Sequence, residues 1–200
     1  MKDRISARFS ENISRVRNLV DIYSTHLSGR GGGRRGHSKT DVLRAAVVLL
    51  HAATEDLLRS LAYWKLPLAA GDVLSKIPLI ATGPAAKFSL GELSAHRGKN
   101  VDAVIAESVN GYLERSNYNN TDEVASLLTS IGVPVAEVNN HFTQLSEVMG
   151  RRHLIVHRAD RSEAGGRGNH SVRSIGPRTV SDWITGVESF GTAVLDQIAE

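Results

Sequence analysis

Residues 41–59 read DVLRAAVVLLHAATEDLLR, and their apolar side chains recur every three or four positions. This period is typical of an amphipathic helix. Ser38 and Asp41 resemble a capping pair at the start of the helix, and Pro67 stops it. The unbroken apolar run at residues 45–50 leaves little surface for water. We therefore expect this helix to lie at the centre of the fold.

Two further long helices are predicted towards the two ends of the sequence. One spans residues 3–26, and the other opens at Thr179-Val180-Ser181-Asp182. Apolar residues three or four positions apart give each helix one face to bury. They are Ile5, Phe9, Ile13, Val16, Leu19, Val20, Tyr23 and Leu27 in the first helix, and Trp183, Ile184, Val187, Phe190, Val194, Leu195 and Ile198 in the last.

Three shorter helices are predicted between these. Residues 100–116 form one, and residues 122–130 form a second, capped from the Asn-rich turn 117–120. A third begins near Pro134 and leads into the basic run at residues 150–158. No stretch alternates with the period of a strand. The sequence thus predicts an all-α bundle of about six helices.

Glycine and proline mark the connecting segments. Residues 28–37 and 163–169 are glycine-rich, which predicts two flexible loops. Residues 67–98 are broken by glycines and prolines, with a short helix expected at 89–96, and we expect this segment to wrap around the bundle. We treat residues 1–200 as a single domain.

Composition narrows the classes of protein. Of the 200 residues, 41% are hydrophobic, which is enough for a core, and none is cysteine, which removes disulfides, thiolate nucleophiles and cysteine-ligated metals. The charged start lacks a signal-peptide core, and the longest apolar stretch is too short to span a bilayer. We expect a soluble, cytoplasmic protein. Net charge is +3, but clustered arginines such as Arg34 and Arg35 suit polyanions, although solvated loop charge is the simpler interpretation.

The candidate for chemistry is Gly150-Arg-Arg-His-Leu-Ile-Val-His-Arg158. On a helix, His153 and His157 would lie on one face, and Arg152 could reach the same cleft. A structural alternative is that these cations only complement the negative end of the helix dipole.

Two other motifs are matched incompletely. Residues 33–40 resemble a P-loop, but Ser38 replaces a required glycine and no strand precedes it, so we treat the match as false. The spacing of His153 and His157 suits helical zinc ligands, but Leu154 stands where HExxH has its glutamate. We therefore expect neither a metal nor a cofactor.

Arg152-His-Leu-Ile-Val-His157 resembles the R-x4-6-H motif of HEPN domains, in which a polar residue commonly follows the arginine, as His153 does here. Residues 41–59, residues 87–93 and residues 152–160 together are similar to the RiboL-PSP-HEPN branch over most of the chain. This resemblance implies a homodimeric helical bundle whose two motifs share one cleft. It also implies metal-independent cleavage of RNA, in a toxin–antitoxin or antiviral system with a possible antitoxin or other partner protein.

The resemblance implies roles for individual residues. Arg152 would hold the phosphate, His157 would serve as base or acid, and His153 would assist. Arg151 and Arg158, with Arg34 and Arg35, would bind the RNA backbone.

Glu55 and Asp56 are weaker candidates, which would face the cleft and tune the arginine, and an exposed acidic helix face is the simpler interpretation. Ala159 stands where some HEPN proteins carry a tyrosine that accepts AMP, so we do not expect that form of control. A non-catalytic HEPN module that binds nucleotide, RNA or a partner remains the alternative. A DNA-binding regulator would need a helix-turn-helix, and the sequence offers no convincing one.

Overall fold

The central helix is α2, His37–Lys65, with 29 residues. The computed structural model describes residues 1–29, 37–79, 90–161 and 171–198. Helix α2 contacts α1, α5, α6, α7 and α8, and its leucines at positions 43, 50, 57, 58 and 61 are almost completely buried. The prediction of a core helix at this position is confirmed.

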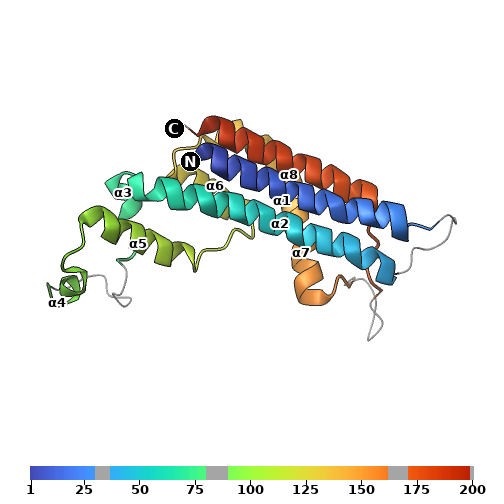
Figure 1. The fold of residues 1–200 in the computed structure, drawn as a ribbon, viewed down its shortest axis with the longest axis horizontal. Coiled ribbons are helices and arrows are strands. Elements are labelled where there is room, and N and C mark those ends of the chain that lie inside the picture. Colours follow the sequence, from blue (N-terminus) through green and yellow to red (C-terminus); the bar gives the residue numbers. More distant parts are fainter. Residues whose placement is uncertain (30–36, 80–89, 162–170, 199–200) are drawn as a thin grey trace.

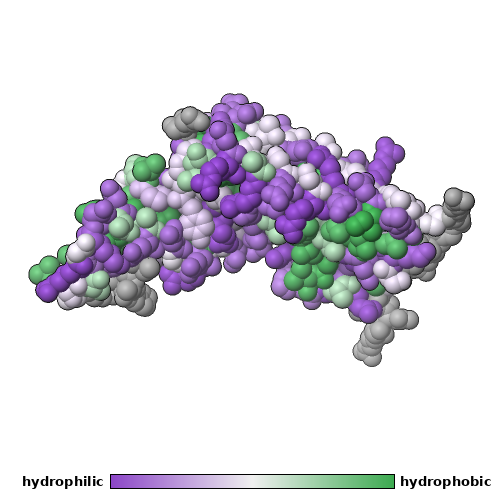
Figure 2. Space-filling view, viewed as in Figure 1, coloured by the Kyte–Doolittle hydropathy of each residue, from purple (hydrophilic) through white to green (hydrophobic). Residues whose placement is uncertain are grey.

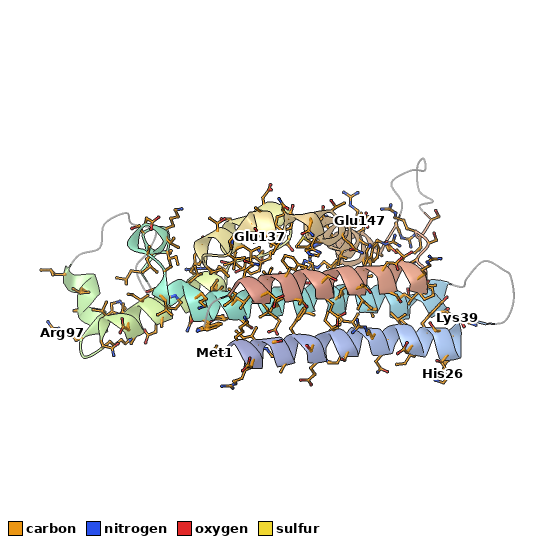
Figure 3. All side chains as sticks on the ribbon, turned by 90° about the horizontal axis from the view of Figure 1, so that it is seen from above. Met1, His26, Lys39, Arg97, Glu137 and Glu147 are labelled. Carbon is orange, nitrogen blue, oxygen red and sulfur yellow. The ribbon has the colours of Figure 1, made fainter. Side chains whose placement is uncertain are left out.

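Helix α1, Lys2–Ile22, packs along α2 and continues into one turn of π-helix, Tyr23–Leu27. Helix α8, Pro177–Gln197, packs against α1, α2 and α7. Seen from above, α2 and α8 lie between α1 on one side and α6 and α7 on the other (Figure 3). Edge-to-face packing of Phe142 and Phe190, with ring centroids 6.4 Å apart, joins α7 to α8.

Helix α7, Phe142–Arg158, starts later than the sequence predicts. Pro134 instead precedes a short 3-10 turn, Val135–Glu137, and a second such turn, Asn139–His141, leads into α7. Proline suits the start of either kind of helix, because the backbone N–H that it lacks would have no partner within the helix at that position. The C-terminal end of α7 projects past α2 on the lower side of the bundle in Figure 1.

The segment predicted to wrap the bundle does not do so in its described residues. The short helices α3, Gly71–Leu74, and α4, Leu90–Leu93, lie with α5, Val101–Leu113, at one end of the molecule (Figure 1). Helix α6, Thr121–Ser130, follows, and the Asn120 side chain caps it by accepting the backbone N–H of Glu123 at 2.9 Å.

The described residues contain six helices of ten residues or more, α1, α2, α5, α6, α7 and α8, as the periodicity predicts. They contain no strand, and their one isolated bridge joins Arg161 to Val172. Within these ranges, no helix combines the length and the apolar character that crossing a membrane requires.

Candidate functional site

The last two turns of α7 carry a pair of exposed histidines. The ring centroids of His153 and His157 lie 4.7 Å apart, with 45° between the ring planes. Their four-residue spacing predicts this proximity because it returns the chain to the same helix face. Arg158, also exposed, follows directly. The surface thus offers two neighbouring imidazoles beside an exposed guanidinium.

Arg152 lies between this surface and α2. Its side chain is half-buried, and it forms no ion pair with another residue in the described part of the chain. Its charge nevertheless reaches His51 of α2, where it disfavours protonation. A guanidinium without a carboxylate partner keeps its planar set of donors for an external anion.

His51 is the buried neighbour of Arg152, with only 2% of the residue exposed. Burial lowers the pKa of His51; the charge of Arg152 acts in the same direction, and Glu55 and a hydrogen bond to the backbone of Tyr118 oppose it. Its Nδ1 lies 3.8 Å from Oε2 of Glu55, beyond hydrogen-bonding distance. His51 is therefore a neutral imidazole beside the arginine near pH 7.

Arg59 and Tyr118 hold the chain that follows α5 next to His51. Arg59 donates to the backbone carbonyl oxygens of Leu113 and Ser116, the latter at 3.1 Å, and its guanidinium carbon lies 6.0 Å from the Tyr118 ring centroid. Burial raises the pKa of Tyr118 to about 12, although Arg59 opposes the shift. The Tyr118 phenol therefore stays neutral near pH 7. The two hydrogen bonds from Arg59 hold the chain that follows α5 against α2.

A second cluster anchors the end of α7. Asp160 is completely buried, and its Oδ2 accepts hydrogen bonds from Nε of Arg44 at 2.7 Å and from a terminal nitrogen of Arg151 at 2.8 Å. Arg44 also donates to Thr40 Oγ1 and to the carbonyl oxygen of Arg173, each at 2.7 Å. Two guanidinium groups thus offset one buried carboxylate, as a charge without access to water requires.

The backbone beyond α7 brings Asp160 into this cluster. Ala159 and Asp160 have φ of 49° and 57°, so the helix ends in the left-handed region. The N–H of Asp160 donates to the carbonyl oxygen of Leu154 at 2.9 Å, and its own carbonyl accepts the N–H of Arg173, also at 2.9 Å. The turn therefore reverses the chain and places the carboxylate under the last turns of the helix.

The structure separates the predicted site residues into groups. Arg152, His153, His157 and Arg158 lie together on the end of α7, and Glu55 faces the same side of α2 as His51. Arg34 and Arg35 lie outside the described residues.

Two other predicted positions have different partners. Arg151 lies inside the buried cluster with Asp160, so its charge is not directed to a surface. Asp56 is directed towards α1 instead. It accepts Nε of Arg8 at 3.0 Å on the α1 side, because adjacent helical residues point about 100° apart.

Sequence reasoning missed Arg44, His51 and Asp160. Arg44 and His51 interrupt the buried face of α2, and a polar residue at a core position is itself a signal of a buried network. Asp160 carries no such signal, because its burial depends on the left-handed turn at residues 159–160.

Hydrophobic side chains gather next to the site. Figure 2 shows them over the half of α2 nearer its start and over the C-terminal end of α7. On α2 they include an exposed or half-exposed strip that we call the apolar strip, formed by Ala45, Val48, Leu49 and Ala52. On α7, Val156 is 48% exposed.

A cavity of about 600 Å³ lies elsewhere, between α3, α5 and α6, and none of its lining residues belongs to α7. Among the described residues, no group of three or more histidines or carboxylates could hold a metal, so His153 and His157 lack a third ligand there. No family model matches the chain, and neither the curated proteins nor the solved structures include a match.

Proposed function

We propose that this chain is a metal-independent endoribonuclease of the HEPN type, acting in the cytoplasm as a toxin or antiviral effector. The observation that carries the proposal is the end of α7. There, a guanidinium without an ion-pair partner among the described residues and two adjacent, exposed imidazoles lie within six residues of one helix. Phosphate binding and proton transfer at one place are what phosphodiester cleavage needs.

The residues suit transesterification. His157 removes the proton of a 2′-hydroxyl, whose oxygen attacks the adjacent phosphorus, while Arg152 binds the non-bridging oxygens as charge builds on them. The bond from phosphorus to the 5′-oxygen breaks, and an imidazolium protonates the departing oxygen. The products are a 2′,3′-cyclic phosphate and a 5′-hydroxyl. His153 assists by orienting the substrate, and Arg158 contributes backbone affinity.

The second imidazole comes from a second copy of the chain. The apolar strip and Val156 support this part of the proposal, because exposed apolar side chains gathered beside a polar site are typical of an interface. In a two-fold dimer each copy would offer the same surface to the other. A Val48→Glu variant should then be monomeric by light scattering and lose cleavage, whereas Leu68→Glu, at an exposed leucine near α3, should leave both unchanged.

The test is cleavage of cellular RNA by purified protein in EDTA, with analysis of product ends. Wild type should cleave and leave 2′,3′-cyclic phosphates, whereas Arg152→Ala and His157→Ala should not. His26→Ala is the matched control, because this exposed histidine lies in the π-helical turn that follows α1, far from α7 in Figure 3.

Two outcomes would contradict the proposal. RNA binding without cleavage by wild type would favour a non-catalytic binding module, and cleavage that survives His157→Ala would remove the histidine from the mechanism.

A further inference from the structure

One ion pair encloses the whole candidate motif. Arg151 precedes Arg152, Asp160 follows His157 by three positions, and a terminal nitrogen of Arg151 lies 2.8 Å from Oδ2 of Asp160. The ion pair therefore joins the two ends of a short segment of chain, and residues 152–157 lie between these ends. No other ion pair between described residues encloses the motif so closely.

Arg44 joins this closed segment to the central helix. It donates to the same Oδ2 of Asp160 at 2.7 Å, and its other nitrogens are held by Thr40 and by the carbonyl oxygen of Arg173. All of the Arg44 side chain except 8% is buried, so the guanidinium has little freedom to change partners. The end of α7 is thus fixed to α2 two turns before His51, the residue that Arg152 approaches.

The orientation of Arg152 follows from this anchor. Adjacent residues on a helix point about 100° apart. When Asp160 draws Arg151 inward, Arg152 is directed to the His51 side, and the His153 and His157 rings to the exposed side. Asp160 also offsets the charge of Arg151, so on this turn Arg152 is the arginine without a carboxylate partner in the described ranges of the chain.

We propose that Asp160 is a positioning residue: through Arg151 and Arg44 it holds the turn that carries Arg152 and His157 in the geometry that RNA cleavage requires. This inference rests on the proposed function. Asp160 itself touches no substrate, because it is completely buried beneath the helix end. A shift of the two catalytic groups by about 1 Å is enough to lower the rate strongly.

Asp160→Asn is the decisive variant. It removes the charge and keeps the shape, and asparagine tolerates the left-handed φ of 57° at this position. The control is Glu188→Gln, which removes a carboxylate of the same kind from the exposed ion pair with Arg17. Two measurements are made on the full chain: amide hydrogen exchange of residues 152–160, and kcat and KM for RNA cleavage.

For Asp160→Asn we expect exchange of these amides to accelerate about tenfold or more, with α1 and α8 unchanged. The value of kcat should fall roughly 10- to 100-fold, while KM changes little, because binding affinity is spread over other cationic groups. Glu188→Gln should match wild type in both measurements. If Asp160→Asn lacks helical circular dichroism, Arg44→Lys replaces it, since this variant keeps the charge and loses the fork of donors.

Wild-type exchange and wild-type kcat in the folded variant would overturn the inference. So would a fall in kcat accompanied by uniform acceleration over the whole bundle, which would indicate general destabilisation. If wild type itself cleaves no RNA, the proposed function fails on that assay alone. The exchange comparison then still decides whether Asp160 anchors this turn, because it needs no activity.

Discussion

The rings of His153 and His157 lie next to each other on consecutive turns of α7, with 4.7 Å between their centroids. In the proposed mechanism only one of them exchanges a proton with the substrate, so their replacements should differ. We expect His157→Ala to lower kcat by about 100-fold or more, as the loss of a general acid or base does, and His153→Ala to lower it by only about tenfold. Single-turnover cleavage measures both, and equal losses would contradict the division of roles.

Arg44 should be worth far more to stability than an arginine in an exposed ion pair. Arg44→Ala leaves the buried Asp160 carboxylate with one partner, and we expect the free energy of unfolding to fall by about 3–5 kcal/mol. Arg17→Ala breaks the exposed pair with Glu188 and should cost no more than about 1 kcal/mol. Urea denaturation at pH 7 compares the two, and similar losses would contradict the burial argument.

His51 should make stability depend on pH. Because burial lowers the pKa of His51 in the folded protein, the unfolded chain binds the proton more tightly. The free energy of unfolding therefore falls as the pH drops below about 6.5, the ordinary value for histidine, and continues to fall towards the lower value of the folded state. His51→Gln cannot titrate and should show a flatter profile between pH 7.5 and 5. Parallel profiles from urea denaturation would exclude His51 as the source.

Two glycines should respond oppositely to alanine. A Cβ at Gly191 of α8 would collide with the ring of Phe9 and approach Leu57 Cδ2 to 3.1 Å, so Gly191→Ala should destabilise the protein by about 1–3 kcal/mol. A Cβ at Gly150 of α7 meets nothing within 4 Å, and Gly150→Ala should stabilise the helix by up to about 1 kcal/mol. Thermal unfolding separates the two, and a stable Gly191→Ala would mean that α1 and α8 pack less closely than described.

The helices could be predicted because their signals are local. Apolar periodicity located α1, α2 and α8, and the Asn120 cap located the start of α6. The prediction that α7 starts near Pro134 was wrong, since a proline precedes a 3-10 turn as readily as an α-helix. The wrapping predicted for residues 67–98 was wrong in the described part of that segment for a different reason, because glycines and prolines indicate a break without indicating a direction.

The candidate site was only partly predictable. Their spacing on one helix predicts that His153 and His157 lie on the same face, and the structure confirms this prediction. The partner of Arg151 does not follow from spacing, because Asp160 reaches it through a left-handed turn, and Arg44 joins them from 116 positions away. Contacts between distant parts of a chain leave no periodic trace in sequence.

The packing of α1 against α8 also constrains when this bundle can complete its folding during synthesis. Phe9, near the start of the chain, lies against Gly191, and Trp183 of α8 donates to Glu147 of α7 at 3.0 Å. Helices α1, α2 and α7 therefore emerge from the ribosome before the helix that covers them. We expect the first half of α7, which carries Glu147, to lack this cover until α8 has been translated, so the bundle completes its packing only at that stage.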